Sequence, residues 1–145
     1  MDHTFLFHPG LWQAQGFYYD DSGRPLPFSG STEIIHTEEL WFNRGRMEIH
    51  AEEDIVIENN YRIVPLREGM DVTSWESENP ALGVLSGKFY IVGDSIISTC
   101  VTRRGHYSGT EFMVRQSESH YLSRGIFSDG EKRLSSWVVD LKKTR

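Results

Sequence analysis

Ionisable side chains are densest in the stretch RRGHYSGTEFMVRQSESHYLSRG, residues 103–125. Antiparallel pairing of its two halves would bring together a carboxyl, a histidine and two arginines: Glu111, His120, Arg115 and Arg124. Such a set is either a ladder of charges on a solvated sheet face or a polar cluster that orients a carboxylate or carbonyl ligand, because the arginine fork donates two parallel hydrogen bonds. The face with Thr110, Phe112 and Val114 is the more apolar. We therefore expect that face to point inward and the charged face to be solvated.

The six histidines are scattered along the chain, at His3, His8, His36, His50, His106 and His120. No H-x-H pair with a nearby acidic residue occurs, so the sequence predicts neither a metal site nor a cofactor. His36 shares a strand face with Thr32 and Ile34, which favours an inward position. His50 alternates with Glu48 and Glu52 on what we expect to be a surface.

No recognised catalytic pattern is present. The sequence lacks G-x-S-x-G, a P-loop and G-x-G-x-x-G. Neighbouring acidic residues such as Glu38 and Glu39 would point to opposite faces of a strand and could not act as a catalytic pair. The single cysteine, Cys100, lies in the strand-like run ISTCVT, where cysteine usually behaves as a small apolar side chain. Whether the protein is an enzyme is therefore left open.

Composition narrows the class of protein and of partner. With 145 residues the chain fits one domain, and its net charge of −6 is spread along the sequence. No clustered basic face is evident, so nucleic acid and anionic membranes are not expected partners. One cysteine cannot form an internal disulfide, and we find no signal peptide and no apolar run of about 18 residues, so the expected location is the cytoplasm.

Most of the chain has the pattern of β-strands separated by turns rich in Gly, Asn and Asp. Turns are expected at residues 20–23, 43–45, 58–60, 92–94, 103–105 and 128–130. The segment Ser31–Phe42 has some helix-forming character, but Thr37 and Glu38 interrupt an apolar helical face, so a strand is favoured. The predicted strands, some of which would merge into about eight to ten, are Leu11–Tyr19, Pro27–Thr37, Arg46–Glu52, Ile55–Ile57, Tyr61–Leu66, Val72–Ser77, Leu82–Ile91, Ser95–Thr102, His106–Gln116, His120–Phe127 and Arg133–Leu141.

So many strands must hide their edges, either in a two-sheet sandwich or in a closed barrel. Long strands joined by short turns favour an all-β, antiparallel up-and-down barrel as a single domain over residues 1–145, with terminal tails at 1–9 and 142–145. A barrel of about eight strands is wide enough for its own side chains or one small ligand. The residues expected to line such a ligand site are Tyr18, Phe28, His36, Tyr61, Trp75, Tyr90, Tyr121 and Trp137.

Gly10-Leu11-Trp12 forms a G-x-W triplet at the start of the first long strand. In that position it resembles the opening motif of the lipocalins and of the wider calycin group, which includes fatty-acid-binding proteins. The resemblance implies that Trp12 closes the barrel floor and that an arginine near the end of the barrel stacks across it, either Arg133 or Arg124. The T-D-Y triplet and the long first loop of lipocalins are absent.

Three functions fit these expectations. The first is binding of a small hydrophobic or amphipathic molecule in the barrel, as in a lipocalin-like carrier. The second is a small cofactor-free enzyme of cyclase, isomerase or hydratase type. The third is a structural module with a solidly packed barrel, and a homodimer is compatible with each. A pocket in the barrel would argue against the solidly packed structural module. Buried ionisable groups around that pocket would favour the enzyme over the carrier.

Overall fold

The computed structural model describes residues 2–145, which form strands and turns and no helix. The ten strands are β1 (Gly10–Tyr19), β2 (Pro25–His36), β3 (Trp41–Ile49), β4 (Ile55–Ile63), β5 (Val72–Asn79), β6 (Gly83–Val92), β7 (Ser95–Thr102), β8 (Ser108–Ser117), β9 (His120–Ser128) and β10 (Arg133–Lys143). A helix long and apolar enough to cross a membrane is accordingly not found among the described residues.

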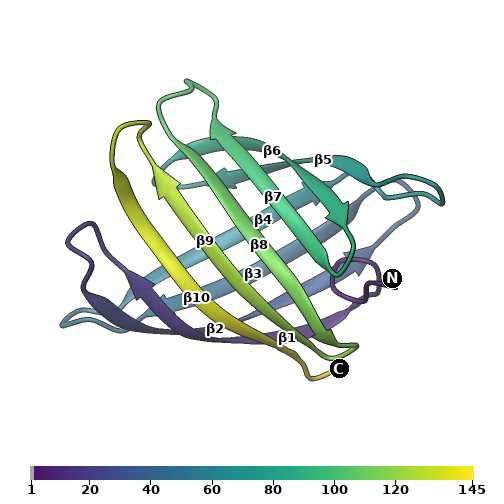
Figure 1. The fold of residues 1–145 in the computed structure, drawn as a ribbon, viewed down its shortest axis with the longest axis horizontal. Helices are drawn as coiled ribbons and strands as arrows, with labels where there is room; N and C mark the ends of the chain where they lie inside the picture. Colours follow the sequence, from purple (N-terminus) through teal and green to yellow (C-terminus); the bar gives the residue numbers. More distant parts are fainter. Residues whose placement is uncertain (1) are drawn as a thin grey trace.

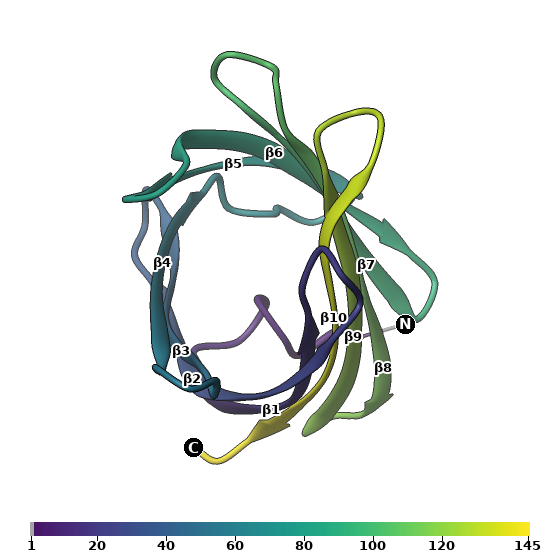
Figure 2. The same ribbon diagram turned by 90° about the vertical axis from the view of Figure 1, so that its left-hand side faces the viewer.

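The strands close into one antiparallel barrel (Figures 1 and 2). Each strand pairs with its neighbours in the sequence, and β1 pairs with β10 from Trp12 opposite Lys143 to Tyr19 opposite Ser136. Closure satisfies the backbone groups that an open sheet would leave at its edges. The prediction of an up-and-down barrel is confirmed, as is the strand in place of a helix in residues 31–42, where β2 turns into β3.

Four of the six predicted turns are present and contain a glycine in the left-handed region, Gly23, Gly93, Gly105 and Gly130. The turns expected at residues 43–45 and 58–60 are wrong, because these segments pair with each other in the middle of β3 and β4. Asn43 lies opposite Tyr61, and Gly45 lies opposite Asn59. All four of these residues belong to the inward face, where Asn and Gly are tolerated because the interior is not uniformly apolar.

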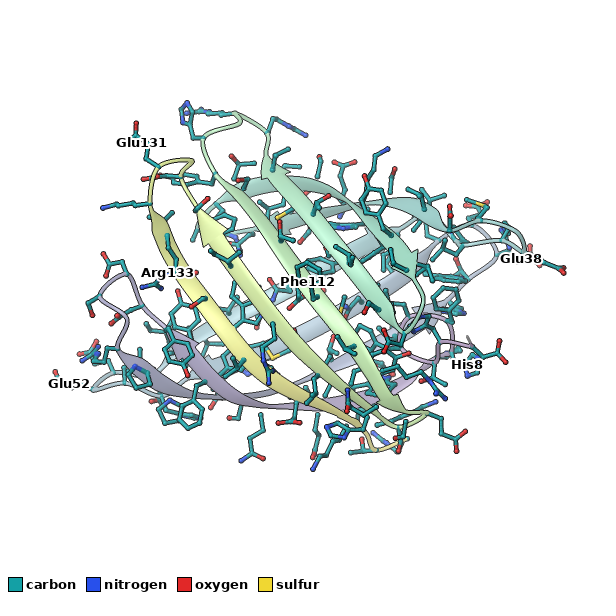
Figure 3. All side chains as sticks on the ribbon, viewed as in Figure 1. His8, Glu38, Glu52, Phe112, Glu131 and Arg133 are labelled. Carbon is teal, nitrogen blue, oxygen red and sulfur yellow. The ribbon has the colours of Figure 1, made fainter. Side chains whose placement is uncertain are left out.

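The alternation of side chains puts one face of every strand inside the barrel. On β3 and β10 the inward face includes Ile49 and Val139, which are 2% and 4% exposed. The prediction for β8 is wrong. Met113 is 3% exposed and shares the inward face with Glu111 and Arg115, whereas Phe112 is 46% exposed on the outer wall (Figure 3).

The apolar composition of the outer wall explains why the inward face of β8 was predicted wrongly. Phe112 lies in a row of directly paired outward residues that crosses five strands, Ile97, Phe112, Arg124, Val138 and Phe17. This row is more apolar than the inward row beside it, which contains Glu111. Hydrophobicity alone therefore does not distinguish the two faces of this part of the barrel.

The segment before β1 is not a tail. Within the described residues, Phe5 and Leu6 are 3% and 0% exposed, and His3 and Thr4 are also buried. The segment enters the ring of strands (Figure 2) and packs against Trp12, with the rings of Phe5 and Trp12 edge to face at 5.3 Å between centroids. The N-terminal segment, residues 3–7, thus fills one end of the barrel, and the expected tail over residues 2–9 is corrected.

The C-terminal residues are ordered by pairing as well. β10 continues to Lys143, and Leu11 N–H donates to the carbonyl of Arg145 at 2.9 Å. Thr144 N–H donates to the carbonyl of Leu11 at 2.8 Å. The expected tail at 142–145 is therefore part of the seam that closes the barrel.

Candidate functional site: the barrel interior

The barrel interior has two halves that differ in packing. The closed half surrounds the N-terminal segment, and most of its inward side chains are buried: Trp12, Ile34, Ile63, Phe89, Ile96, Met113, Tyr121 and Leu141. His36, Ile91 and Arg115 are half-buried there. The open half lies toward the β1–β2 and β3–β4 turns, and most of its inward side chains are only half-buried: Tyr18, Phe28, Met47, Ile57, Asn59, Tyr61, Cys100, Glu111, Phe127 and Trp137. Leu26, Ile49, Ser77, Leu85 and Thr102 are buried in this half. An inward side chain that keeps accessible surface borders space within the barrel or at its open mouth.

Aromatic rings lie flat against the wall of the open half because glycines on neighbouring strands leave room for them. Trp137 pairs with Gly125 across β10 and β9, and a Cβ at Gly125 would overlap the indole ring. Trp75 pairs with Gly87 in the same way across β5 and β6. A glycine in a strand often marks such a close approach. The rings therefore form the surface of the internal space without filling it.

Glu111 is the carboxyl group of this interior. Its Oε2 accepts hydrogen bonds from Trp137 Nε1 at 2.7 Å and from Ser123 Oγ at 2.8 Å. Burial raises the pKa of the Glu111 carboxyl above its usual value, and the two hydrogen bonds oppose that shift. Within residues 2–145 Glu111 forms no ion pair.

Tyr61 and Cys100 face the same space. The ring of Tyr61 stacks on Trp75, with 4.7 Å between centroids and 26° between planes. Burial, together with the negative charge of Glu111, raises the pKa of both the Tyr61 phenol and the Cys100 thiol. Both groups are therefore neutral hydrogen-bonding groups near physiological pH, and Cys100 lacks the lowered pKa of a reactive thiolate.

Two polar atoms of β5 are enclosed without a partner among residues 2–145, Trp75 Nε1 and Ser77 Oγ. Both residues are on the inward face, and Ser77 is completely buried. Unpaired buried donors cost free energy, roughly 1–3 kcal/mol each. A site that keeps such groups has hydrogen bonds available for a bound molecule or for water.

The structure separates the residues that the sequence predicted as a ligand site. Tyr18, Phe28, Tyr61, Trp75 and Trp137 all point inward from five different strands, and most of their rings line the open half.

The other three predicted site residues lie elsewhere. Tyr121 and His36 are inward but belong to the closed half, where Tyr121 Oη bonds to His3 Nδ1 at 2.7 Å and His36 Nε2 bonds to the carbonyl of Leu6 at 2.7 Å. The expectation that Tyr90 points inward is wrong, because its side chain is 36% exposed on the outer wall.

Trp12 lies on the barrel floor as expected, but neither of the two candidate arginines stacks on it. Trp12 is fully buried on the floor of the barrel, but its neighbours are Phe5 and Tyr121, whose rings meet the indole edge to face. Arg133 is at the far end of β10 and donates to the carbonyl of Asp20 at 2.8 Å (Figure 3). Arg124 points outward. Aromatic rings from the N-terminal segment and β9 occupy the position expected for the arginine.

Sequence reasoning missed Glu111 and Phe127 as inward residues. The available signal was the glycine opposite each of these two residues, since Gly109 pairs with Phe127 and Gly125 pairs with Glu111. Glycines in the interior of β8 and β9 indicate a face where rings approach the backbone closely. That signal requires the strand register, which the sequence does not supply.

Two other features lie on the outer wall. A hollow of about 740 Å³, open to solvent, spans β4–β7 and is lined by Arg62, Val64, Glu76, Lys88, Tyr90 and Val101, among others. Glu48, His50 and Asp54 place potential metal-ligand atoms within 4.8 Å of one another at the β3–β4 turn. His50 Nε2 already bonds to Ser29 Oγ at 2.9 Å, and its other nitrogen pairs with Asp54. The hollow also reaches Trp75 and Cys100, but Tyr61, Glu111 and Trp137 line neither feature.

The chain matches no protein-family model and no curated protein. Among solved structures it is similar to the S-type phycobiliprotein lyase CpeS from Guillardia theta, with a TM-score of 0.68 over 97% of this chain and 91% of that chain. The two sequences are 11% identical, so the likeness is one of fold. It shows that this closed calycin-like barrel is also the architecture of a known protein.

Proposed function

We propose that this protein binds a small apolar or amphipathic molecule in the open half of its barrel. The observation that carries the proposal is the contrast in packing between the two halves. Most inward side chains around the N-terminal segment are buried, whereas a larger share of those in the open half is only half-buried. An apolar lining with a few polar groups is the usual composition of a small-molecule site.

The similar structure supports this proposal at the level of fold. The similar structure is that of a phycobiliprotein lyase, and the two chains share their fold over most of their lengths. For the present chain we infer only that the barrel accommodates a ligand of modest size. The rings of Tyr61 and Trp137 would contact its apolar part, and Glu111 would contact its polar part.

The test is binding of N-phenyl-1-naphthylamine, a neutral apolar fluorophore, followed by its fluorescence increase. Ile57→Trp adds an inward ring to the open half, and we expect it to weaken binding at least tenfold, or about 1.4 kcal/mol. Val56→Trp adds the same ring to the outer wall, where Val56 is 45% exposed, and should leave binding unchanged. Far-UV circular dichroism and melting curves would establish that both variants are folded.

The proposal fails if the unmodified protein does not bind the fluorophore, or if the two variants weaken binding equally. Absence of binding would favour the structural module with a solidly packed interior. Equal weakening would place the fluorophore on the outer wall, for example in the hollow over β4–β7.

A cofactor-free enzyme is the second candidate, and the surroundings of Glu111 favour it. A carboxyl group whose pKa is raised by burial is suited to proton transfer near neutral pH. Mass spectrometry of a molecule that copurifies with the protein would test this candidate. A ligand released in altered form by the unmodified protein, and unaltered by Glu111→Gln, would indicate catalysis; identical release from both would indicate carriage.

A further inference from the structure

The two oxygens of the Glu111 carboxyl group have different surroundings. Both protein donors, Trp137 Nε1 and Ser123 Oγ, converge on Oε2. Oε1 has no hydrogen-bond partner among residues 2–145, yet it is not one of the enclosed polar atoms without a partner. Protein surrounds the residue, so the surface that Oε1 keeps faces the internal space.

The donors hold the carboxyl in a fixed orientation. The indole ring of Trp137 lies against the wall over Gly125, and Gly125 is also the residue paired with Glu111. Ser123, the second donor, is 2% exposed on the neighbouring strand β9. Two donors on Oε2 fix the plane of the carboxyl and present Oε1 to the interior.

No cation within the described part of the chain forms an ion pair with this carboxyl. The inward cation of the same strand, Arg115, lies in the closed half, where burial chiefly, and the charge of Arg115 in addition, lower the pKa of His3. A buried carboxylate without a cationic partner is costly, and a ligand that supplies a well-placed cation recovers part of that cost.

We infer that the molecule bound in the open half carries a positively charged nitrogen with N–H groups, a protonated amine or an amidinium, which donates to Oε1 of Glu111. The inference rests on the proposed function. The surrounding rings suit such a ligand, because aromatic faces attract cations as well as apolar groups. The ring of Tyr61, which stacks on Trp75, would contact the ligand's apolar part.

The test compares two probes that differ in one charge, dansylcadaverine with its primary amine and the N-acetyl derivative, which is neutral. The unmodified protein should bind the amine at least tenfold more tightly than the acetyl derivative. Glu111→Gln should abolish this preference, since the Gln carbonyl can still accept from Trp137 and Ser123 but carries no charge. Glu76→Gln removes a carboxylate from the exposed outer face of β5 and should retain the preference.

Each outcome decides one question. Equal binding of the two probes by the unmodified protein overturns the inference and leaves the proposed function standing. A preference that survives Glu111→Gln also overturns the inference, because another group then supplies it. Failure of both probes, together with N-phenyl-1-naphthylamine, overturns the proposed function. The comparison within the unmodified protein does not depend on any variant being folded.

Discussion

At the scale of single residues, the cost of burying the Glu111 carboxyl group should be measurable. Its pKa is raised in the folded protein, chiefly by burial. The folded state therefore holds a proton to higher pH than the unfolded chain does. Stability is then lost as the pH rises from the unfolded value through the folded one. The residue weakens the fold at neutral and alkaline pH and not in acid.

Glu111→Gln should raise the melting temperature at pH 8, by about 2–4 °C if about 1 kcal/mol is recovered. At pH 4.5 the difference should shrink or reverse, because the carboxyl is then protonated in the folded state. Near-UV circular dichroism melts at both pH values measure this. Glu76→Gln, on the exposed face of β5, is the matched control and should show no such dependence. A Glu111→Gln difference that is the same at both pH values would contradict the argument.

At the scale of elements, the packing of the Trp137 indole over Gly125 links strands β9 and β10 to the candidate site. A Cβ at Gly125 would overlap the indole ring and displace it from the wall. The displaced ring would lose its hydrogen bond to Glu111, which spans 2.7 Å. The strand pairing of β9 and β10 and the orientation of the carboxyl thus depend on the same glycine.

Gly125→Ala should destabilise the protein by about 1–3 kcal/mol, the usual cost of overpacking, and should alter the near-UV tryptophan signal. In a Trp137→Leu background the same substitution should cost much less, because the overlapping ring is gone. Urea unfolding of the four proteins in this cycle gives the coupling energy. Additive effects would show that the ring is not seated on Gly125.

The N-terminal segment is an element without regular structure, and its role depends on packing. Phe5→Ala should cost about 3–5 kcal/mol, because it removes a buried ring that is 3% exposed and packs on Trp12. Phe17→Ala, on the outer wall at 46% exposure, should cost less than about 1 kcal/mol. Urea unfolding of both variants provides the comparison. Equal losses would mean that the segment does not stabilise the barrel end.

Most strands and the glycine turns are predictable from sequence, because alternation and positive φ are local properties. Gly93 and Gly130 mark their turns by residue type alone. The interior is not predictable in the same way. Asn43 and Asn59 resemble turn residues, yet they are inward strand residues of a partly polar lumen. The N-terminal segment has no periodicity, and only the closed barrel gives Phe5 and Leu6 a place to be buried.

At the scale of the whole molecule, closure joins residues that are far apart in the chain. The seam between β1 and β10 pairs Trp12 with Lys143, and backbone hydrogen bonds extend it to Arg145. Contacts of this sequence separation are expensive to form, so barrels of this kind fold slowly relative to helical proteins. The core around Trp12 includes residues of this seam and of the N-terminal segment. The core can therefore form fully only when the barrel closes.

The filled end of the barrel limits where a ligand could enter and leave. Residues 3–7 occupy one end of the barrel. A molecule bound in the open half, as proposed, would therefore have to enter and leave at the other end, beside the β1–β2 and β3–β4 turns.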